Sequence, residues 1–220
     1  MNEIIFFLHV ILVVTFSLGA LFFGKSALIS MICLQSILAN LFVVKQMTLF
    51  GMAVTCSDVF IIGSVLCLNL LQEYFGQEIV KKTIRINFFV IFFYLIMSQL
   101  HIFYTPNSFD FTHNSFLSIL NFMPRITIAS IFTYFLVQMS DCWLYGLLKL
   151  HFAGRYLVGR NIFSICCTQL LDTLLFSFLG LYGIVGSILN VILVSFTIKI
   201  IIIFLTTPFV SFAKKVVRNI

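Results

Sequence analysis

The chain has 220 residues, of which 61% are hydrophobic and only 9% are charged. Soluble domains carry about 25% charged and roughly 45–50% apolar residues, so this composition excludes a water-soluble fold and predicts a chain solvated mostly by lipid. The net charge of +6 does not indicate nucleic-acid binding, because the basic residues recur in short clusters between apolar stretches and form no single patch.

A transmembrane helix needs about 20 mostly apolar residues, and seven stretches of the chain approach that length. In chain order they are Ile4–Gly24, Leu28–Val44, Ala53–Leu71, Ile86–Leu100, Phe116–Ser140, Ile162–Tyr182 and Ile184–Thr206. The first stretch lacks a basic leading segment, so we expect a retained helix and not a cleaved signal peptide. A very short turn near Gly183 joins the last two.

These stretches predict the fold class. We expect an all-α polytopic membrane protein, a bundle of about seven transmembrane helices made of a six-helix core plus an N-terminal helix. Nothing in the sequence resembles a linker, so residues 1–220 are expected to form a single transmembrane domain.

The basic residues predict the orientation. They follow the first, third, fifth and last stretches: Lys25; Lys81, Lys82 and Arg85; Lys149, Arg155 and Arg160; and Lys214, Lys215 and Arg218. The segment 101–115 has no Lys or Arg, and Lys45 is the one charge that departs from the alternation. Because basic loops stay in the cytoplasm, we expect the N-terminus outside and the C-terminus inside.

Several strongly polar side chains fall within or at the ends of the apolar stretches. Such groups cost roughly 2.5 kcal/mol or more each at membrane depth and are therefore candidates for function. Three pairs share a helix face through spacings of three or four: Asn69 with Glu73, Gln138 with Asp141, and Gln169 with Asp172. Ser164, Thr168 and Asp172 extend the polar face of the sixth stretch. We expect these helices to enclose one polar chamber.

Carboxylates beside carboxamides are complementary to a ligand with adjacent N–H donors and a carbonyl acceptor, such as the edge of a guanine-like base. Two alternatives use the same residues. Asp141 and Asp172 are also suited to a proton relay that couples transport to proton movement. In a purely structural network, Arg125, Arg160 and Lys199 neutralise the carboxylates.

Signatures of other chemistry are absent from the sequence. It contains no H-E-x-x-H or G-x-S-x-G motif, no phosphate-binding glycine loop, and no Cys/His spacing typical of zinc. We therefore expect a transporter or a binding subunit with no cofactor and no metal, and not an enzyme.

Four groups of residues, in order along the chain, resemble motifs of the queuosine precursor transporter family, also called the vitamin uptake transporter family. They are Ala39 to Lys45 with Leu49-Phe50-Gly51; Pro124-Arg125 with Ala129-Ser130, Tyr134, Gln138 and Asp141; Arg160-Asn161 with Ser164, Gln169, Asp172 and Phe176; and Lys199 with Thr207-Pro208-Phe209. Together they extend from about Gly24 to Pro208.

The resemblance implies import of a 7-deazaguanine base (preQ0, preQ1 or queuine) across the bacterial inner membrane for tRNA modification. By motif, it implies Gln138, Asp141, Gln169 and Asp172 as the leading substrate-binding residues, and Arg125, Arg160 and Asn161 after them. The expected partners are this base and the lipid bilayer, with no nucleic acid; proton coupling and a homo-oligomer are both compatible with the sequence. The alternatives are a substrate-binding subunit that needs a separate ATPase and, from another class, an assembly factor of a membrane complex.

One segment departs from the family pattern. Where the family has T-D-x-x-N-E-x-Y-G, this chain has Asn69, Gln72 and Phe75 in place of the Asp, the Asn and the Tyr. One negative charge is lost. The change fits either a less cationic or bulkier ligand or drift at a structural position.

Overall fold

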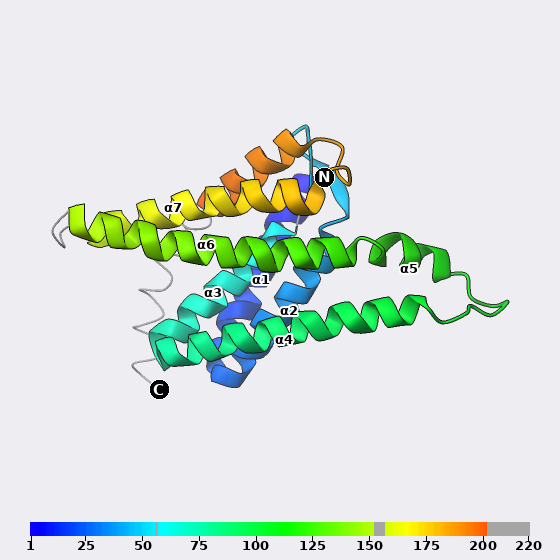
Figure 1. The fold of residues 1–220 in the computed structure, drawn as a ribbon, viewed down its shortest axis with the longest axis horizontal. Helices are drawn as coiled ribbons and strands as arrows, with labels where there is room; N and C mark the ends of the chain where they lie inside the picture. The colour runs from blue at the N-terminus through cyan, green and yellow to red at the C-terminus, as the bar shows by residue number, and fades with distance from the viewer. Residues whose placement is uncertain (56, 152–156, 202–220) are drawn as a thin grey trace.

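The computed structural model describes residues 1–55, 57–151 and 157–201. The described chain is mostly helical (Figure 1). Its elements are α1 (Asn2–Phe22), α2 (Lys25–Phe42), β1 (Gln46–Leu49), β2 (Met52–Thr55), α3 (Asp58–Phe75), α4 (Gln77–Ile102), α5 (His113–Leu120), α6 (Met123–His151), α7 (Leu157–Phe176) and the π-helical turn η1 (Ser177–Leu181). A last helix, Ile188–Ile201, is drawn in orange without a label in Figure 1 and is called here the 188–201 helix.

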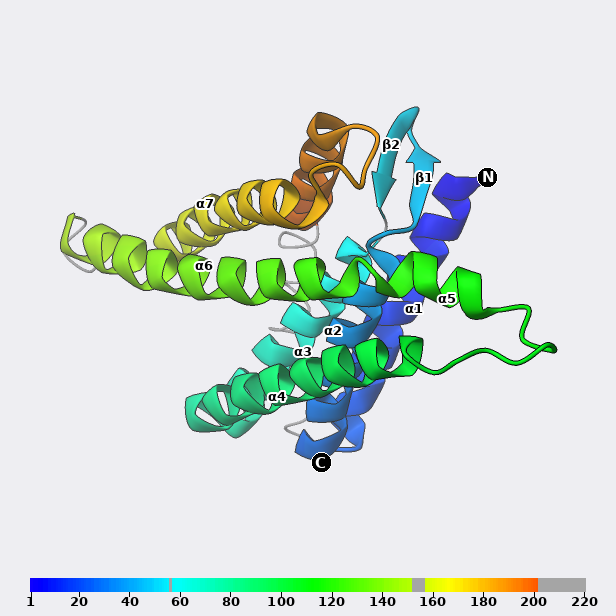
Figure 2. The same cartoon turned by 45° about the vertical axis from the view of Figure 1, so that its right-hand side comes forward.

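The helices form two groups that meet along α4 and α6. In the first group α2 packs most extensively on α3, with α1 and α4 beside this pair. In the second group α6 and α7 lie side by side, and η1 packs against both (Figures 1 and 2). Contacts of α6 with α2 and α4 join the groups. The arrangement leaves α2, α3, α4, α6 and α7 facing a common interior.

Buried apolar side chains fix this arrangement in three clusters. One joins α1, the two strands, α3 and the 188–201 helix through Phe6, Leu49, Val54, Val59, Ile62, Val194 and Ile198. A second lies among the first four helices and includes Leu28, Ile32, Leu66, Leu70 and Leu71. The third joins the end of α2 to α6, η1 and the 188–201 helix through Val43, Ile126, Leu181, Val185 and Val191.

A β-hairpin between α2 and α3 corrects the all-α prediction. The strands pair antiparallel, with Gln46 opposite Thr55 and Leu49 opposite Met52. The two-residue turn has positive φ at both Phe50 (50°) and Gly51 (78°), as a type I′ turn requires. The expected third span was therefore wrong at its start, because Ala53 to Thr55 belong to β2 and the helix begins at Asp58. Average hydrophobicity does not separate a short apolar strand from a helix.

The helix ends differ from the apolar stretches in other places. The fifth stretch is divided by a turn at residues 121–122 between α5 and α6, and α6 continues to His151. The sixth begins earlier than expected, at Leu157, and closes through η1. Residues 182–187 connect η1 to the 188–201 helix. This connection is longer than the tight turn expected near Gly183. The ends differ because hydropathy identifies only the residues suited to lipid, whereas a helix can extend past them into polar surroundings.

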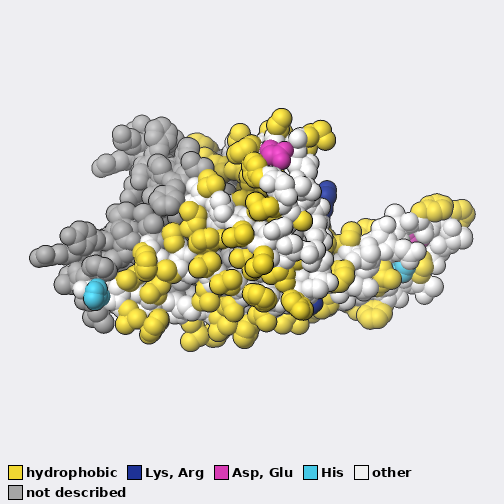
Figure 3. Space-filling model, turned by 90° about the horizontal axis from the view of Figure 1, so that it is seen from above, with side chains coloured by type: hydrophobic (Ala, Val, Ile, Leu, Met, Phe, Trp, Pro, Cys, Tyr) yellow, Lys and Arg dark blue, Asp and Glu magenta, His cyan; other side chains and the backbone are white. Residues whose placement is uncertain are grey.

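Each of the seven apolar stretches contains a helix. Within the described ranges, four helical segments are long and apolar enough to cross a membrane: Asn2–Phe22, Lys25–Phe42, Glu78–Ile102 and His113–Val137. The last of them runs through the turn between α5 and α6. Three more helices are apolar but shorter, Asp58–Gln72, Cys166–Leu181 and Ile188–Ile201. The outer surface carries many exposed Phe, Leu and Ile side chains, and Figure 3 shows one such face with few charges. A surface of this kind suits acyl chains.

The loop between α4 and α5 projects from the bundle (Figures 1 and 2). Asp110 organises it, because its Oδ1 accepts hydrogen bonds from the Thr112 N–H and Oγ1 at 2.8 Å and from the His113 N–H at 3.0 Å. The bonds to Thr112 and His113 hold the pKa of this exposed carboxyl below its usual value.

Gly63 lies where α3 packs on α1 and α2, and the space around it is full. A Cβ at this position would lie 2.2 Å from Gln35 Oε1 and 2.4 Å from Val13 Cγ1. Gln35 is 2% exposed, and its Nε2 donates to Ser17 Oγ at 3.0 Å, so it is not free to move aside. Small residues allow close approach of helices in membrane proteins.

We expect Gly63→Ala to destabilise the protein by about 1–3 kcal/mol, because the added methyl overpacks this contact. Thermal unfolding of the purified protein in detergent measures the effect. Gly19→Ala on α1 is the matched control, since no heavy atom lies within 4 Å of a Cβ there. Equal unfolding temperatures for the two variants would contradict the packing argument.

Candidate functional site

A cavity of about 180 Å³ lies in the common interior, lined by residues of α2, α3, α4, α6, α7 and the 188–201 helix. Apolar and polar side chains both line its wall. The polar ones are Ser36, Asn40, Thr55, Ser57, Asp58, Ser64, Asn87, Ser130, Thr133, Tyr134, Asp172, Thr173, Ser177, Ser195 and Lys199. A small cavity in which apolar and aromatic walls carry convergent polar groups is typical of a site for a small molecule.

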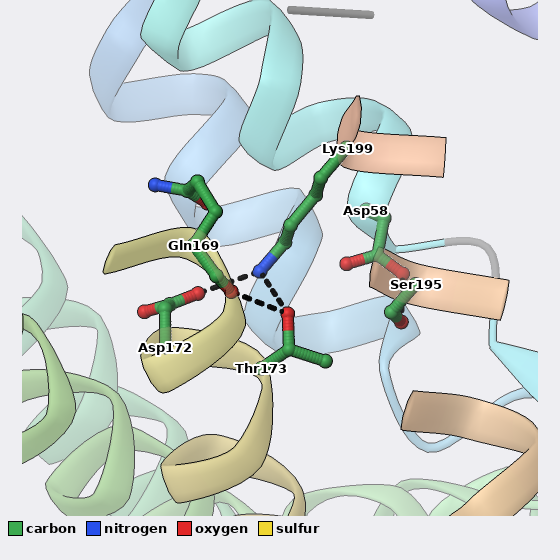
Figure 4. Close-up of polar contacts among 6 residues, drawn as sticks. All are labelled: Asp58, Gln169, Asp172, Thr173, Ser195 and Lys199. Carbon is green, nitrogen blue, oxygen red and sulfur yellow. Dashed lines mark hydrogen bonds and ion pairs between the residues drawn. The ribbon is translucent and has the colours of Figure 1, made fainter. Parts of the chain in front are cut away.

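Lys199 is the central cation of this cavity. The residue is 4% exposed, and its Nζ donates to Asp172 Oδ2 at 2.6 Å and to Thr173 Oγ1 at 3.1 Å (Figure 4). Thr173 in turn donates to the Gln169 carbonyl at 2.8 Å. An ammonium has three N–H donors, and the bonds to described residues use two of them. The third donor has no hydrogen-bond partner among the described residues.

Asp58 lies on the other side of Lys199 from Asp172 (Figure 4). It is 5% exposed, at the first position of α3, and its Oδ2 accepts a short hydrogen bond from Ser195 Oγ. The Lys199 ammonium interacts electrostatically with both carboxylates. Within the described part of the chain, Asp172 has an ion pair with Lys199, and Asp58 has no ion pair.

Two further groups on the wall have unused hydrogen-bonding capacity. Thr133 is 1% exposed, and its Oγ1 has no hydrogen-bond partner among the described residues. Asn87 donates through Nδ2 to Ser36 Oγ at 3.0 Å, while its Oδ1 is likewise without a described partner. Buried polar atoms are normally satisfied, so such atoms on a cavity wall indicate a place for a polar ligand or water.

The structure places the predicted site residues in different surroundings. Asp172 faces the cavity. Gln169 contributes its carbonyl to Thr173 but does not line the cavity, and in Figure 4 its side chain points away from Lys199. Ser164 is buried on α7 outside the cavity wall. Asn69 is exposed on α3. Arg125 Nε donates a hydrogen bond to the Leu179 carbonyl at 3.0 Å, and this bond connects the start of α6 to η1.

Five predicted side chains lie outside the described part of the structure. They are Glu73 on α3, Gln138 and Asp141 on α6, and Arg160 and Asn161 on α7. The same holds for Thr207-Pro208-Phe209 and for the basic residues Lys214, Lys215 and Arg218.

Sequence reasoning missed Asp58, Thr173 and Ser195 as site residues. A signal for Asp58 was present, since it falls within an expected span, where a carboxylate is as unfavourable as at Asp172. Thr173 and Ser195 had no such signal, because hydroxyl groups are common in membrane helices. The described residues contain no group of three or more His, Cys, Asp or Glu side chains that could hold a metal ion.

A helical bundle with lipid-compatible faces and an internal polar cavity defines a membrane protein that binds a small solute. Residues 55–213 match the family described as "Putative vitamin uptake transporter", so the chain belongs to this family of membrane transporters, which are not enzymes. It is also 29% identical over 216 residues to the "Probable queuosine precursor transporter" of Bacillus subtilis (strain 168), across 96% of this chain and 93% of that protein. These matches confirm the resemblance found in the motifs. No solved structure matches the chain significantly.

We expect Lys199→Met to destabilise the protein strongly, because it leaves Asp172 as a buried charge without its partner. Removing one member of a buried pair costs about 3–5 kcal/mol, and the 25% exposure of the Asp172 side chain places the effect near the lower value. The double variant Lys199→Met with Asp172→Asn should recover most of this loss, as measured by thermal unfolding in detergent.

Lys81→Met is the control, since its ion pair with Glu78 at 2.8 Å is exposed and such pairs contribute about 0–1 kcal/mol. The expectation fails if Lys199→Met unfolds at the same temperature as Lys81→Met.

Proposed function

We propose that this protein imports a queuosine precursor, a 7-deazaguanine base, across the bacterial inner membrane for tRNA modification. The observation that carries the proposal is the buried pair of Lys199 and Asp172 in the wall of a small internal cavity. Charged groups in a membrane domain are costly and face the interior where they serve a substrate or ion. The family and the name of the Bacillus subtilis relative support the class of substrate.

The pair has the chemistry that one edge of such a base requires. A guanine-like ring presents a carbonyl oxygen next to a ring N–H. Lys199 has an N–H available to donate to the carbonyl, and the neighbouring Asp172 is an acceptor for the ring N–H. Adjacent donor and acceptor groups of opposite charge recognise this edge and reject rings that lack either group, because a buried partner would remain unpaired.

The rest of the wall suits a planar ring of small size. Phe88, Tyr134 and Phe176 line the cavity, and the Phe88 and Tyr134 rings pack edge to face with centroids 5.0 Å apart. Aromatic faces of this kind stack on heterocycles. The volume of about 180 Å³ is below the ~300–1,000 Å³ of sites for drug-sized ligands and suits a single base. Gln138, Asp141, Gln169, Arg160 and Asn161 remain proposed contributors on the strength of their motifs.

For the membrane arrangement we propose seven spans in a single transmembrane domain, with the N-terminus outside and the C-terminus in the cytoplasm. The described helices in all seven apolar stretches support the count, and the alternation of basic loops supports the orientation. We further propose that proton movement drives uptake, with Asp172 and Asp141 as the candidate proton carriers.

A second candidate function is that of a substrate-binding membrane subunit driven by a separate ATPase. The sequence has no phosphate-binding glycine loop, so ATP-driven uptake would need a partner chain. The two candidates differ in whether this chain is sufficient for uptake.

Expression of this chain alone, in a bacterium that lacks its own precursor transporter and precursor synthesis, should restore queuosine in tRNA when the base is supplied. Asp172→Asn should lower uptake of labelled base by about 10–100-fold, because this factor corresponds to the free energy of one hydrogen bond to a charged group. Asp110→Asn in the exposed loop is the matched control and should transport normally. An uncoupler should abolish uptake if protons drive it.

Failure of the chain alone, followed by restoration when an ATPase partner is supplied, would replace the carrier with the subunit. Failure with every 7-deazaguanine base under both conditions would reject the proposed function altogether.

The proposed orientation predicts which loops are reached from outside the cell. A single cysteine introduced at Asn107, in a background without native cysteines, should react with a membrane-impermeant maleimide in intact cells. A cysteine at Lys81, near the start of α4, should react only after the membrane is opened. The reverse pattern would invert the topology.

A further inference from the structure

The charges around the cavity do not balance among the described residues. Asp58, Asp172 and Lys199 are the charged side chains on its described wall, so two carboxylates face one ammonium. Lys199 is hydrogen-bonded to Asp172 and interacts with Asp58 only through space, while the hydrogen bond that Asp58, at the start of α3, accepts among the described residues comes from the Ser195 hydroxyl. A hydroxyl and a helix N-terminus stabilise a carboxylate less than a full positive charge does.

We propose that Asp58 recognises a positive charge on the ligand, so that the transporter selects 7-deazaguanine bases carrying an ammonium group over neutral ones. This inference rests on the proposed function, because it assigns the edge of the base to Lys199 and Asp172. Asp58 then provides the counter-charge for an aminomethyl substituent on the same ring. A neutral substituent of similar size, such as a nitrile, does not supply this charge.

The position of Asp58 supports this division of roles. It comes from α3, whereas Asp172 comes from α7, and Lys199 lies between them (Figure 4). A base held at its edge by the Lys199–Asp172 pair can therefore direct a substituent toward a second carboxylate in the same cavity. Thr133 and Asn87, whose buried oxygens have no partner in the described part, offer further contacts for a polar ligand there.

The family departure at Asn69 does not offset this charge. Asn69 is exposed and is not part of the cavity wall, so the negative charge missing at that position does not alter the balance around the ligand. The selectivity assigned here thus depends on Asp58 and not on the α3 segment that departs from the motif.

Uptake of two labelled bases by cells expressing the chain tests the proposal: 7-aminomethyl-7-deazaguanine, which is cationic, and 7-cyano-7-deazaguanine, which is neutral. Wild-type protein should prefer the cationic base by about tenfold or more. Asp58→Asn should lower uptake of the cationic base by a similar factor and change uptake of the neutral base by less than about threefold. Asp58→Glu, which keeps the charge, should retain the preference.

Ligand-induced thermal stabilisation of the purified protein in detergent is the second measurement, and it also shows whether Asp58→Asn is folded. Asp110→Asn is the control for loss of an aspartate charge outside the cavity. If the wild type takes up both bases equally, selection by charge is wrong while the proposed function stands. If Asp58→Asn loses both bases equally, Asp58 serves a coupling ion or the fold, and the inference is overturned. If neither base is taken up, both proposals fail.

Discussion

The buried Lys199 ammonium is the constraint on which the interior of this protein depends. A charge at membrane depth is tolerated only with close partners, and the partners of Lys199 come from other helices: Asp172 and Thr173 from α7, and, through electrostatic interaction, Asp58 from α3. Two successive helices near the end of the described chain and α3, which is distant from them in sequence, must therefore meet at one point. The apolar clusters supply contact area, but a cluster of Val, Leu and Ile accepts many packings, whereas an ammonium with two named acceptors accepts few.

This constraint also explains why the polar groups surround a cavity. Lipid replaces water around the bundle, so burial of apolar surface does not drive its helices together as it would in water. Close packing, as at Gly63, and interhelical hydrogen bonds, as between Gln35 and Ser17, hold the first group of helices. The second group meets it around Lys199. The cavity lies at this junction and is lined by side chains of both groups.

The sequence was sufficient for the helices and for part of the site. Apolar stretches located every helix that the structure describes in the seven expected regions, and the motif with Asp172 led to a residue of the cavity wall. Spacing along one helix fixes which side chains share a face, but it does not say which face meets which neighbour. Asn69 consequently lies on the exposed surface, and Asp58 was overlooked although it lies beside Lys199. The hairpin was missed because its short strands are as apolar as the helices around them.

The β-hairpin between α2 and α3 is hydrogen-bonded to the loop that precedes the 188–201 helix. Gln46 in β1 uses both ends of its amide on the loop before the 188–201 helix: Nε2 donates to the Ile184 carbonyl at 3.1 Å, and Oε1 accepts from the Gly186 N–H at 2.9 Å. Two bonds of this kind are worth roughly 1–3 kcal/mol together. Because Leu49 and Val54 of the same hairpin are buried in one cluster with Val194 and Ile198, the hairpin is attached both to this loop and to the helix that carries Lys199.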